Sequence, residues 1–134
     1  VLNERKRVGL WKYFYKNGTI MSQENYKNGL RHGEQFVFYS NGKITERSLF
    51  KKGLLDGTSS KYSSKGILIE EVVYKKGKEN GLAKYFELSG AIKETGIYVE
   101  GKRAGKWEYY IEGEIVTDDE KKKNKATFIK KKEN

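Results

Sequence analysis

The chain is organised by the stretch GLWKYFYKNGTIMSQENYKNGLRHG, residues 9–33. Its glycines stand at positions 9, 18, 29 and 33, so gaps of 9, 11 and 4 residues give a period of 24 residues. The same gaps recur three more times, and a fifth unit begins at Gly105 and reaches Gly113 one residue early. Of the 15 glycines, only Gly96 lies outside this pattern. Such a period is typical of arrays in which each unit packs only on its neighbours.

Each unit contains two glycine turns that bracket two runs of strand length. Asn17-Gly18 and Asn28-Gly29 are Asn-Gly pairs, which favour type I′ hairpin turns because both central residues need a positive φ. Frequent glycine together with β-branched and aromatic residues argues against helix. The sequence therefore predicts an all-β fold: a single-layer, twisted antiparallel β-meander of consecutive hairpins, about nine or ten strands in number, built from 24-residue repeats.

The domain boundaries follow from the same glycine pattern. We expect a repeat array over residues 1–117, with a truncated unit at 1–8 and units that start at 9, 33, 57, 81 and 105. Residues 118–134 are highly charged and are expected to form either a cap, with a last strand at 126–129, or a solvated tail. The chain starts at Val1, which suggests either a mature secreted chain or a segment of a longer one.

Composition limits the classes of partner and of chemistry. The net charge of +10 favours acidic partners, namely anionic lipid, acidic glycan, nucleic acid or an acidic protein, although a basic surface often serves solubility alone. Without cysteine the chain can form neither a disulfide nor a thiolate zinc site. No apolar run approaches the length of a membrane helix. Hydrophobic residues make up only 36% of the chain, which is lean for a compact core.

Strand alternation sorts the side chains onto two faces. The first face is expected to carry Trp11, Tyr13, Tyr15, Ile20, Glu24 and Tyr26, with Tyr15 opposite Ile20 and Tyr26 over Gly9. Its aliphatic position recurs as Ile20, Ile44, Leu68, Ile92 and Ile115. The opposite face is expected to carry many lysines and one aromatic residue per unit: Phe14, Phe38, Tyr62, Phe86 and Tyr110. Ser59 and Lys61 replace larger residues in the third unit, so we expect the weakest packing there.

The motifs Gly9-Leu10-Trp11-Lys12-Tyr13-Phe14-Tyr15, Tyr26-Lys27-Asn28-Gly29 and Gly105-Lys106-Trp107-Glu108-Tyr109-Tyr110 resemble the variant MORN repeat of bacterial proteins, a family sometimes labelled as putative antitoxins of the YwqK type. The resemblance covers about 9–117, although Gln35, Ser59 and Ala83 replace the tryptophan in the middle units. It implies a scaffolding or membrane-associating module without catalytic residues, often in secreted or surface proteins, some of which are implicated in host-cell contact.

Catalytic interpretations find little support in the residues. His32 is the only histidine, and we interpret it as a residue beside a turn. Glu46, Glu70 and Glu94 lie one repeat apart, about 9.6 Å across two strands, which is at the far limit for a pair of carboxylates in an inverting glycosidase. We favour the alternative that each glutamate hydrogen-bonds to cross-strand neighbours. Phosphate-binding and metal-binding motifs are absent from the sequence, so we expect no enzyme activity, no metal and no cofactor.

The recurring aromatic residues are either the core of a single-layer sheet or an extended binding face. On the second interpretation, the predicted partner-binding face consists of Trp11, Tyr13, Tyr15, Tyr26, Tyr39, Phe50, Tyr74, Tyr85, Tyr98, Trp107 and Tyr109. The sequence thus predicts a non-enzymatic module for protein interaction or scaffolding at the cell envelope or outside the cell. The alternatives are a cytoplasmic antitoxin-like protein that neutralises a toxin, and binding of anionic lipid through the basic face. Nucleic acid is disfavoured because the lysines are spread over every unit.

Overall fold

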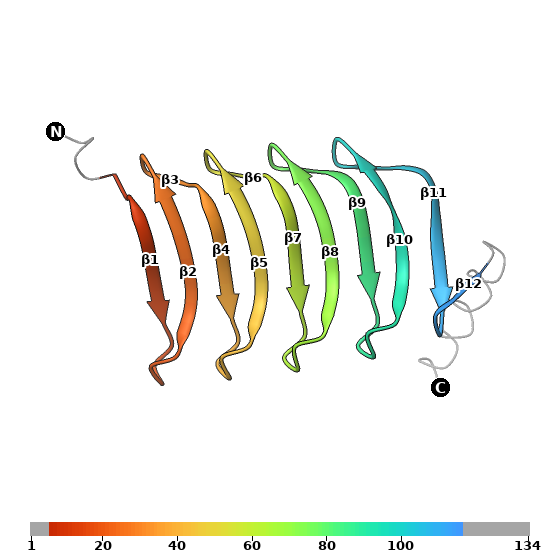
Figure 1. Cartoon of the computed structure of the whole chain (residues 1–134), viewed down its shortest axis with the longest axis horizontal. Helices are drawn as coiled ribbons and strands as arrows, with labels where there is room; N and C mark the ends of the chain where they lie inside the picture. Colours follow the sequence, from red (N-terminus) through yellow and green to blue (C-terminus); the bar gives the residue numbers. More distant parts are fainter. Residues whose placement is uncertain (1–5, 117–134) are drawn as a thin grey trace, which may run out of the picture.

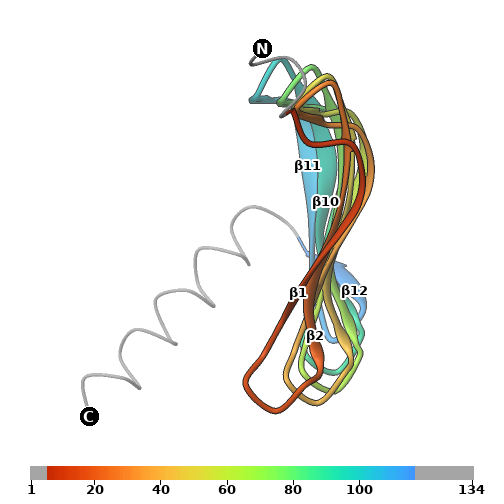
Figure 2. The same ribbon diagram turned by 90° about the vertical axis from the view of Figure 1, so that its left-hand side faces the viewer.

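The structure is a computed structural model that describes residues 6–116 and shows one open, twisted sheet without a second layer (Figures 1 and 2). Twelve strands are joined in antiparallel pairs, and ten of them follow the order β1-β2-β4-β5-β7-β8-β9-β10-β11-β12, while β3 pairs with β2 and β6 with β5. The strands are β1 (Gly9–Phe14), β2 (Ile20–Lys27), β3 (Leu30–Arg31), β4 (Gly33–Phe38), β5 (Ile44–Lys51), β6 (Leu54–Leu55), β7 (Gly57–Tyr62), β8 (Leu68–Lys75), β9 (Lys78–Phe86), β10 (Ile92–Val99), β11 (Lys102–Ile111) and β12 (Glu114–Val116). The predicted fold class is therefore confirmed. The predicted cap or tail at 118–134 lies outside the described residues.

Two kinds of turn alternate along the meander. On the upper edge in Figure 1, the two-residue turns are type I′, and both Asn28 (φ 51°) and Gly29 (φ 82°) have a positive φ. On the lower edge the prediction of a type I′ turn at Asn17-Gly18 is wrong, because only the glycine has a positive φ. That loop has three residues, and the N–H of Tyr15 donates to the carbonyl of Thr19 across it. Asn17 stabilises the loop differently, since its Oδ1 accepts a hydrogen bond from the N–H of Thr19 at 3.0 Å.

A one-residue bulge next to each of the first four lower turns changes the predicted face of the aliphatic position. Tyr13 pairs with Ser22, but Phe14 pairs with Ile20, so Met21 is an extra residue and the predicted Tyr15–Ile20 pair is wrong. A bulge shifts the alternation of side chains by one residue. The aliphatic residues therefore lie on the opposite face, each paired with its recurring aromatic residue. The pairs that result from a bulge are Phe14–Ile20, Phe38–Ile44, Tyr62–Leu68 and Phe86–Ile92. Tyr110 and Ile115 form the same kind of pair across the last turn without a bulge.

An aromatic residue lies opposite the first glycine of each of four units, as predicted for Gly9 and Tyr26. The repeats of this pair are Gly33–Phe50, Gly57–Tyr74 and Gly81–Tyr98. Gly33 has a φ of 105°, at the point where β3 ends and β4 begins. A residue with a Cβ is strained in this conformation, and so glycine recurs at the position.

Successive repeats are tied together at both edges of the sheet. On the upper edge the N–H of Gly53 donates to the carbonyl of Arg31, 22 residues earlier, at 2.8 Å. Next to it, the N–H of Lys52 donates to Nδ1 of His32 at 3.4 Å, so the histidine supports the next turn. On the lower edge the hydroxyl of Tyr15 donates to the carbonyl of Phe38 at 2.5 Å. The hydrogen bonds fix the spacing between repeats.

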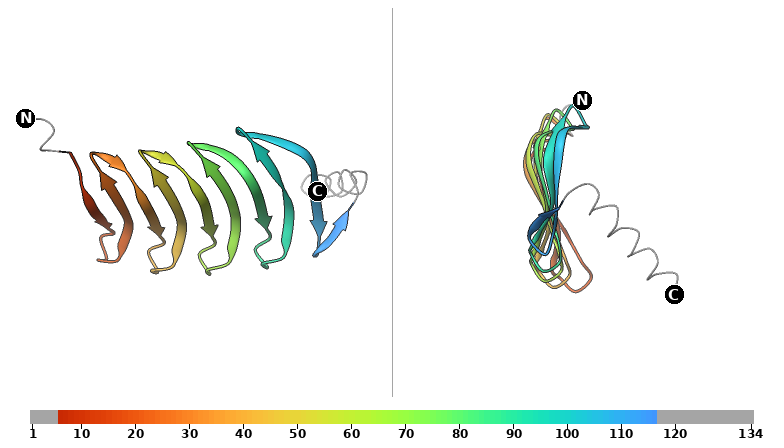
Figure 3. Two further views of the ribbon diagram at one scale, coloured as in Figure 1. Left: turned by 45° about the horizontal axis from the view of Figure 1, so that its top comes forward. Right: turned by 90° about the vertical axis from the view of Figure 1, so that its right-hand side faces the viewer.

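The best-buried side chains lie in the middle of the array. Ser48, Ser59, Val72 and Ala83 are exposed by 5% or less, and the hydroxyls of Ser48 and Ser59 are 3.1 Å apart. These residues occupy equivalent places on neighbouring strands, and each is almost inaccessible to solvent. The expectation of weak packing in the third unit is therefore wrong, because small size permits close coverage here. Two further views show the same single layer (Figure 3).

Candidate interaction site

The structure places nine of the eleven predicted partner-binding residues on one face of the sheet, which we call the aromatic face. They are Trp11, Tyr13, Tyr26, Phe50, Tyr74, Tyr85, Tyr98, Trp107 and Tyr109. Tyr15 and Tyr39 instead use their hydroxyls at the lower edge, on the carbonyls of Phe38 and Tyr62 in the next repeat. These two tyrosines therefore connect repeats. Whether the other nine bind a partner stays a prediction.

The aromatic face carries a charged aromatic cluster at its N-terminal end. The guanidinium of Arg7 lies 4.7 Å from the ring centroid of Trp11, and its Nη1 donates to the hydroxyl of Tyr26 at 3.2 Å. That hydroxyl in turn donates to Glu24, whose carboxylate forms an ion pair with Arg31 at 3.2 Å. Glu24 is buried, and its charge is balanced by these donors.

A second cluster forms at the C-terminal end of the same face. The guanidinium of Arg103 lies 3.9 Å from the ring centroid of Trp107 and forms an ion pair with Glu94 at 2.6 Å. Tyr98 meets the indole edge to face, with centroids 5.1 Å apart. Nε1 of Trp107 is buried and has no hydrogen-bond partner among the described residues. Hydrogen bonding to Glu94 raises the pKa of Arg103. The arginine and its neighbours cover the tryptophan, so the cluster is a packed unit.

Tyrosine hydroxyls in this cluster bond to each other. The hydroxyls of Tyr85 and Tyr98 are 2.9 Å apart. Burial, followed by the hydrogen bond to Tyr98, raises the pKa of Tyr85 well above its usual range, because both disfavour the phenolate. The neutral form of Tyr85 is therefore the form that the fold stabilises.

Two of the three repeated glutamates, Glu70 and Glu94, have the cross-strand partners that the sequence favoured, while the partner of Glu46 is on its own strand. Glu46 accepts a hydrogen bond from Ser48 at 3.2 Å, Glu70 pairs with Lys61 at 3.3 Å, and Glu94 pairs with Arg103. Burial by itself lowers the pKa of Lys61, but the charge of Glu70 raises it overall. Each carboxylate is thus engaged by a neighbour. Within residues 6–116 no group of three or more histidine and carboxylate side chains is arranged to hold a metal ion.

The opposite face, which we call the aliphatic face, carries exposed apolar side chains that the sequence analysis did not select. Eight large apolar residues on it are exposed by 47–59%. They are Leu10, Phe14, Leu30, Leu54, Leu82, Ile97, Val99 and Ile115. Alternation of side chains from Lys12 onward places several leucines on this face. The sequence analysis used this alternation only for the tyrosines and tryptophans. Contiguous exposed apolar surface is typical of interaction sites.

The two faces also differ in charge. Among strand residues with a described pairing partner, the aliphatic face carries eight basic and three acidic side chains: Lys12, Lys27, Arg47, Lys51, Lys75, Lys78, Lys84 and Lys102, against Glu34, Glu71 and Glu108. The aromatic face carries six acidic and three basic ones: Glu24, Glu46, Glu70, Glu79, Glu94 and Glu114, against Arg31, Lys61 and Arg103. Most of the sheet's positive charge therefore lies beside its exposed apolar residues.

The fold and the two faces define an open β-repeat array. The model of the MORN repeat variant family matches two consecutive repeats, at residues 7–28 and 31–52, and the resemblance is confirmed over these repeats. MORN repeats are in general modules for interaction with proteins or membranes. The presence of these repeats suggests a non-enzymatic repeat protein.

Solved structures add only a weak likeness. A crystal structure of a mutant of S. aureus TarM, in complex with Fondaparinux, alpha-GlcNAc-glycerol and UDP, is 19% identical with a TM-score of 0.44 and covers 71% of this chain. A further crystal structure of TarM is 19% identical with a TM-score of 0.43 and covers 75% of this chain. The chain matches only 19% and 20% of those two chains. A search of curated proteins found no match. The described part of the chain contains no helix that is long and apolar enough to cross a membrane.

Proposed function

We propose that the chain is a non-enzymatic interaction module that binds a partner protein across its aliphatic face. The observation that carries this proposal is the segregation of the eight exposed apolar side chains onto one face. Leu82 and Ile97 are direct cross-strand partners there, and Val99 follows two residues later on the same face. A partner that covered these side chains would gain free energy from burial of apolar surface.

The charge of the aliphatic face defines the chemistry of the partner. Lys84 lies beside Leu82 and Ile97, through its pairing with Thr95, and Lys102 pairs with Val99. A complementary surface would have an apolar centre and an acidic rim. A second copy of the chain, face against face, would bring like charges together. We therefore expect an acidic partner, whose association rate decreases as salt is added.

The aromatic face is better suited to hold the sheet together. Its large side chains are mostly half-buried, and its arginines, glutamates and tyrosine hydroxyls are paired with each other. Trp11 and Tyr13 are the most exposed rings on it, at 39% and 36%. Partner binding at these two rings is the competing proposal. The resemblance to repeats of secreted and surface proteins supports a location at the cell envelope or outside the cell, which fractionation tests.

Site-specific photo-cross-linking distinguishes the two faces. A photoreactive amino acid at Leu82 reports on the aliphatic face, and the same amino acid at Tyr13 reports on the aromatic face, because both positions are exposed. After irradiation of intact cells, we expect a discrete adduct from position 82 and none from position 13, and mass spectrometry identifies the partner. An adduct from position 13 alone would move the site to the aromatic face. No adduct at either position would argue against the proposed function.

A further inference from the structure

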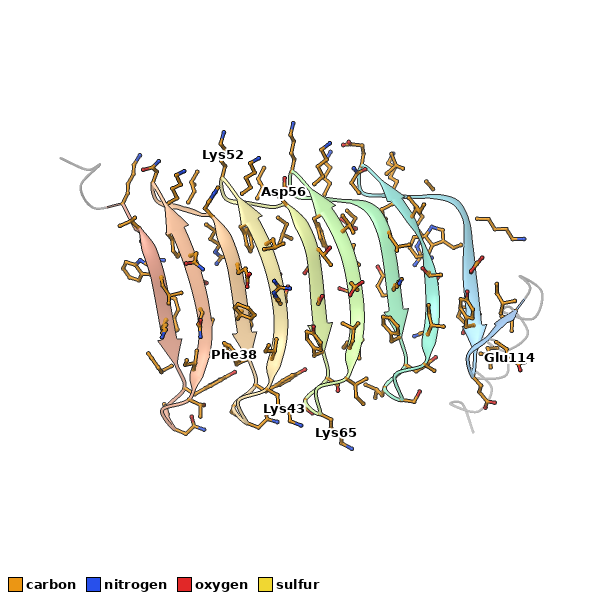
Figure 4. All side chains as sticks on the ribbon, in the orientation of Figure 1. Phe38, Lys43, Lys52, Asp56, Lys65 and Glu114 are labelled. Atoms are coloured by element: carbon orange, nitrogen blue, oxygen red, sulfur yellow. The ribbon has the colours of Figure 1, made fainter. Side chains whose placement is uncertain are left out.

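Lysines line the upper edge of the sheet, where the type I′ turns project. Lys27, Lys51 and Lys75 occupy the same place in three successive repeats, as the last residue before the turn. Lys52 and Lys76 are themselves turn residues with positive φ, and Lys52 projects from this edge in Figure 4. Lys78 directly follows the third turn. All six side chains are exposed.

The spacing of these lysines is fixed by the backbone. The N–H of Gly53 donates to the carbonyl of Arg31, and the N–H of Gly77 donates to the carbonyl of Leu55, each at 2.8 Å. Every turn is thereby attached to the repeat before it. One repeat advances two strands, which is about 9.6 Å. The turns stand in single file along the edge (Figures 1 and 2), so the lysines form a row with a regular interval.

Exposed leucines alternate with the lysines along this row. Leu30 pairs with Lys27, and Leu54 pairs with Lys51. The two leucines are exposed by 50% and 49%, and each lies against the glycine of the next turn. The edge therefore offers an aliphatic contact and an ammonium group in the first two of these repeats, and Lys78 takes the place of the leucine in the third.

Few acidic groups oppose the lysines at this edge. Asp56 is turned towards the backbone, where its Oδ2 accepts a hydrogen bond from the N–H of Lys76 at 3.5 Å. Glu79 pairs with Tyr74 and therefore lies on the aromatic face. The upper edge between residues 27 and 78 is consequently a strip of positive charge.

We propose that this strip, the lysine edge, binds an acidic polysaccharide with carboxylates at regular intervals. The ammonium groups would each bind a carboxylate, and the C–H faces of the sugar rings would pack on Leu30 and Leu54. Single-stranded nucleic acid fits less well, because none of the residues 27–30, 51–54 and 75–78 is an aromatic on which a base could stack. An anionic membrane fits less well. Its head groups are mobile and can meet basic groups at any spacing, so the fixed interval between the lysines would bring no advantage. The lysine edge shares Leu30 and Leu54 with the aliphatic face, but the test below changes only the turn residues Lys52 and Lys76, so its failure would leave the proposed function intact.

The test uses a hyaluronan octasaccharide, which carries a carboxylate on every second sugar. Binding to the full chain is measured by calorimetry at low salt. The variant Lys52→Gln with Lys76→Gln removes two charges from the lysine edge, and the matched control Lys43→Gln with Lys65→Gln removes two charges from the lower edge (Figure 4). We expect a loss of affinity of about tenfold for the first variant and less than about twofold for the second, because only the first lies on the strip.

Three comparisons complete the test. A hyaluronan disaccharide, with a single carboxylate, should bind much more weakly than the octasaccharide, since it can contact only one repeat. Equal losses in the two variants would overturn the proposal, because they would show that net charge alone governs binding. Equal or tighter binding of an oligothymidylate, or of phosphatidylserine vesicles with no binding of the octasaccharide, would also overturn it.

Discussion

The indole of Trp107 lies directly on the backbone of Gly96, so that a Cβ added to this glycine would overlap with Cδ2 of the ring. Gly96 is the one glycine outside the repeated pattern, and it has no positive φ. The equivalent place in earlier repeats holds Glu24, Ser48 or Val72. Glycine is therefore required at this position because the tryptophan ring needs the space, and not because the backbone turns there.

Gly96→Ala should destabilise the chain, although alanine normally improves a strand by about 0.5–1 kcal/mol relative to glycine. The added methyl group must displace the indole, and overpacking of this kind costs about 1–3 kcal/mol. Urea unfolding followed by circular dichroism and by tryptophan fluorescence measures the change. The control repeats the substitution in a Trp107→Ala background, where the methyl group meets no ring. If Gly96→Ala is equally harmful there, the account of this contact is wrong.

Lys76→Asn should stabilise the chain by about 0.5–1 kcal/mol, because asparagine tolerates positive φ better than lysine. Lys76 has a φ of 50° in a type I′ turn. Lys65 also precedes a glycine, but it belongs to the other kind of turn and is not at positive φ. Lys65→Asn is therefore the matched control and should bring no gain. Thermal unfolding measures the Tm of both variants. An equal shift in Tm would show that the two turn types do not differ in their preference for asparagine.

Tyr85 should make stability dependent on pH in the alkaline range. The pKa of Tyr85 is raised in the folded chain, so the folded state holds this proton more tightly than the unfolded state. Its contribution is fully present below about pH 10, the pKa of an unperturbed tyrosine, and is lost as the pH rises further.

Tyr85→Phe removes this contribution, so its free energy of unfolding should fall less steeply than that of the parent chain above about pH 10. Tyr13→Phe, at an exposed ring of the same face, provides the control for removal of a tyrosine. Denaturant titrations at a series of pH values measure both slopes. Parallel curves for Tyr85→Phe and the parent would contradict a raised pKa of Tyr85 in the folded state.

Hydrogen exchange should be slowest in the middle of the sheet. Ser59, Val72 and Ala83 are nearly inaccessible, and their strands have neighbours on both sides. In the described structure β1 has a strand neighbour on one side only. We expect the amides of β7 and β8 to exchange at least about tenfold more slowly than those of β1. Faster exchange in β7 than in β1 would instead support the expectation from the sequence that the third unit is the least protected.

Much of the architecture could be predicted because the glycine period fixes the number and order of the hairpins. The pairing of Gly9 with Tyr26 followed directly from that period. The bulge at Met21 could not be found in this way, since the first four units all contain it and their period stays at 24 residues. The turn types were also hidden, because Lys65-Gly66 and Lys76-Gly77 are the same dipeptide.

The site was predicted less completely than the fold. Tyrosine and tryptophan suggested a binding face, but the structure pairs most of their polar groups within the aromatic face. In a single-layer sheet the side chains of at least one face must pack over the backbone. Composition does not show which of the two faces does so. Alternation from Lys12 could have placed several leucines on the opposite face, but only the register showed that Leu82 lies opposite Ile97.

The central claim is that the aliphatic face, and not the aromatic face, binds the partner protein. Affinity of the cross-linked partner for two double variants tests it most directly: Leu82→Thr with Ile97→Thr, and Trp11→Ala with Tyr13→Ala. All four positions are exposed, and circular dichroism verifies that each variant is folded. We expect the first variant to lose affinity by about tenfold or more, and the second to bind within about twofold of the parent chain. Loss of binding in the second variant, with the first unchanged, would contradict the claim.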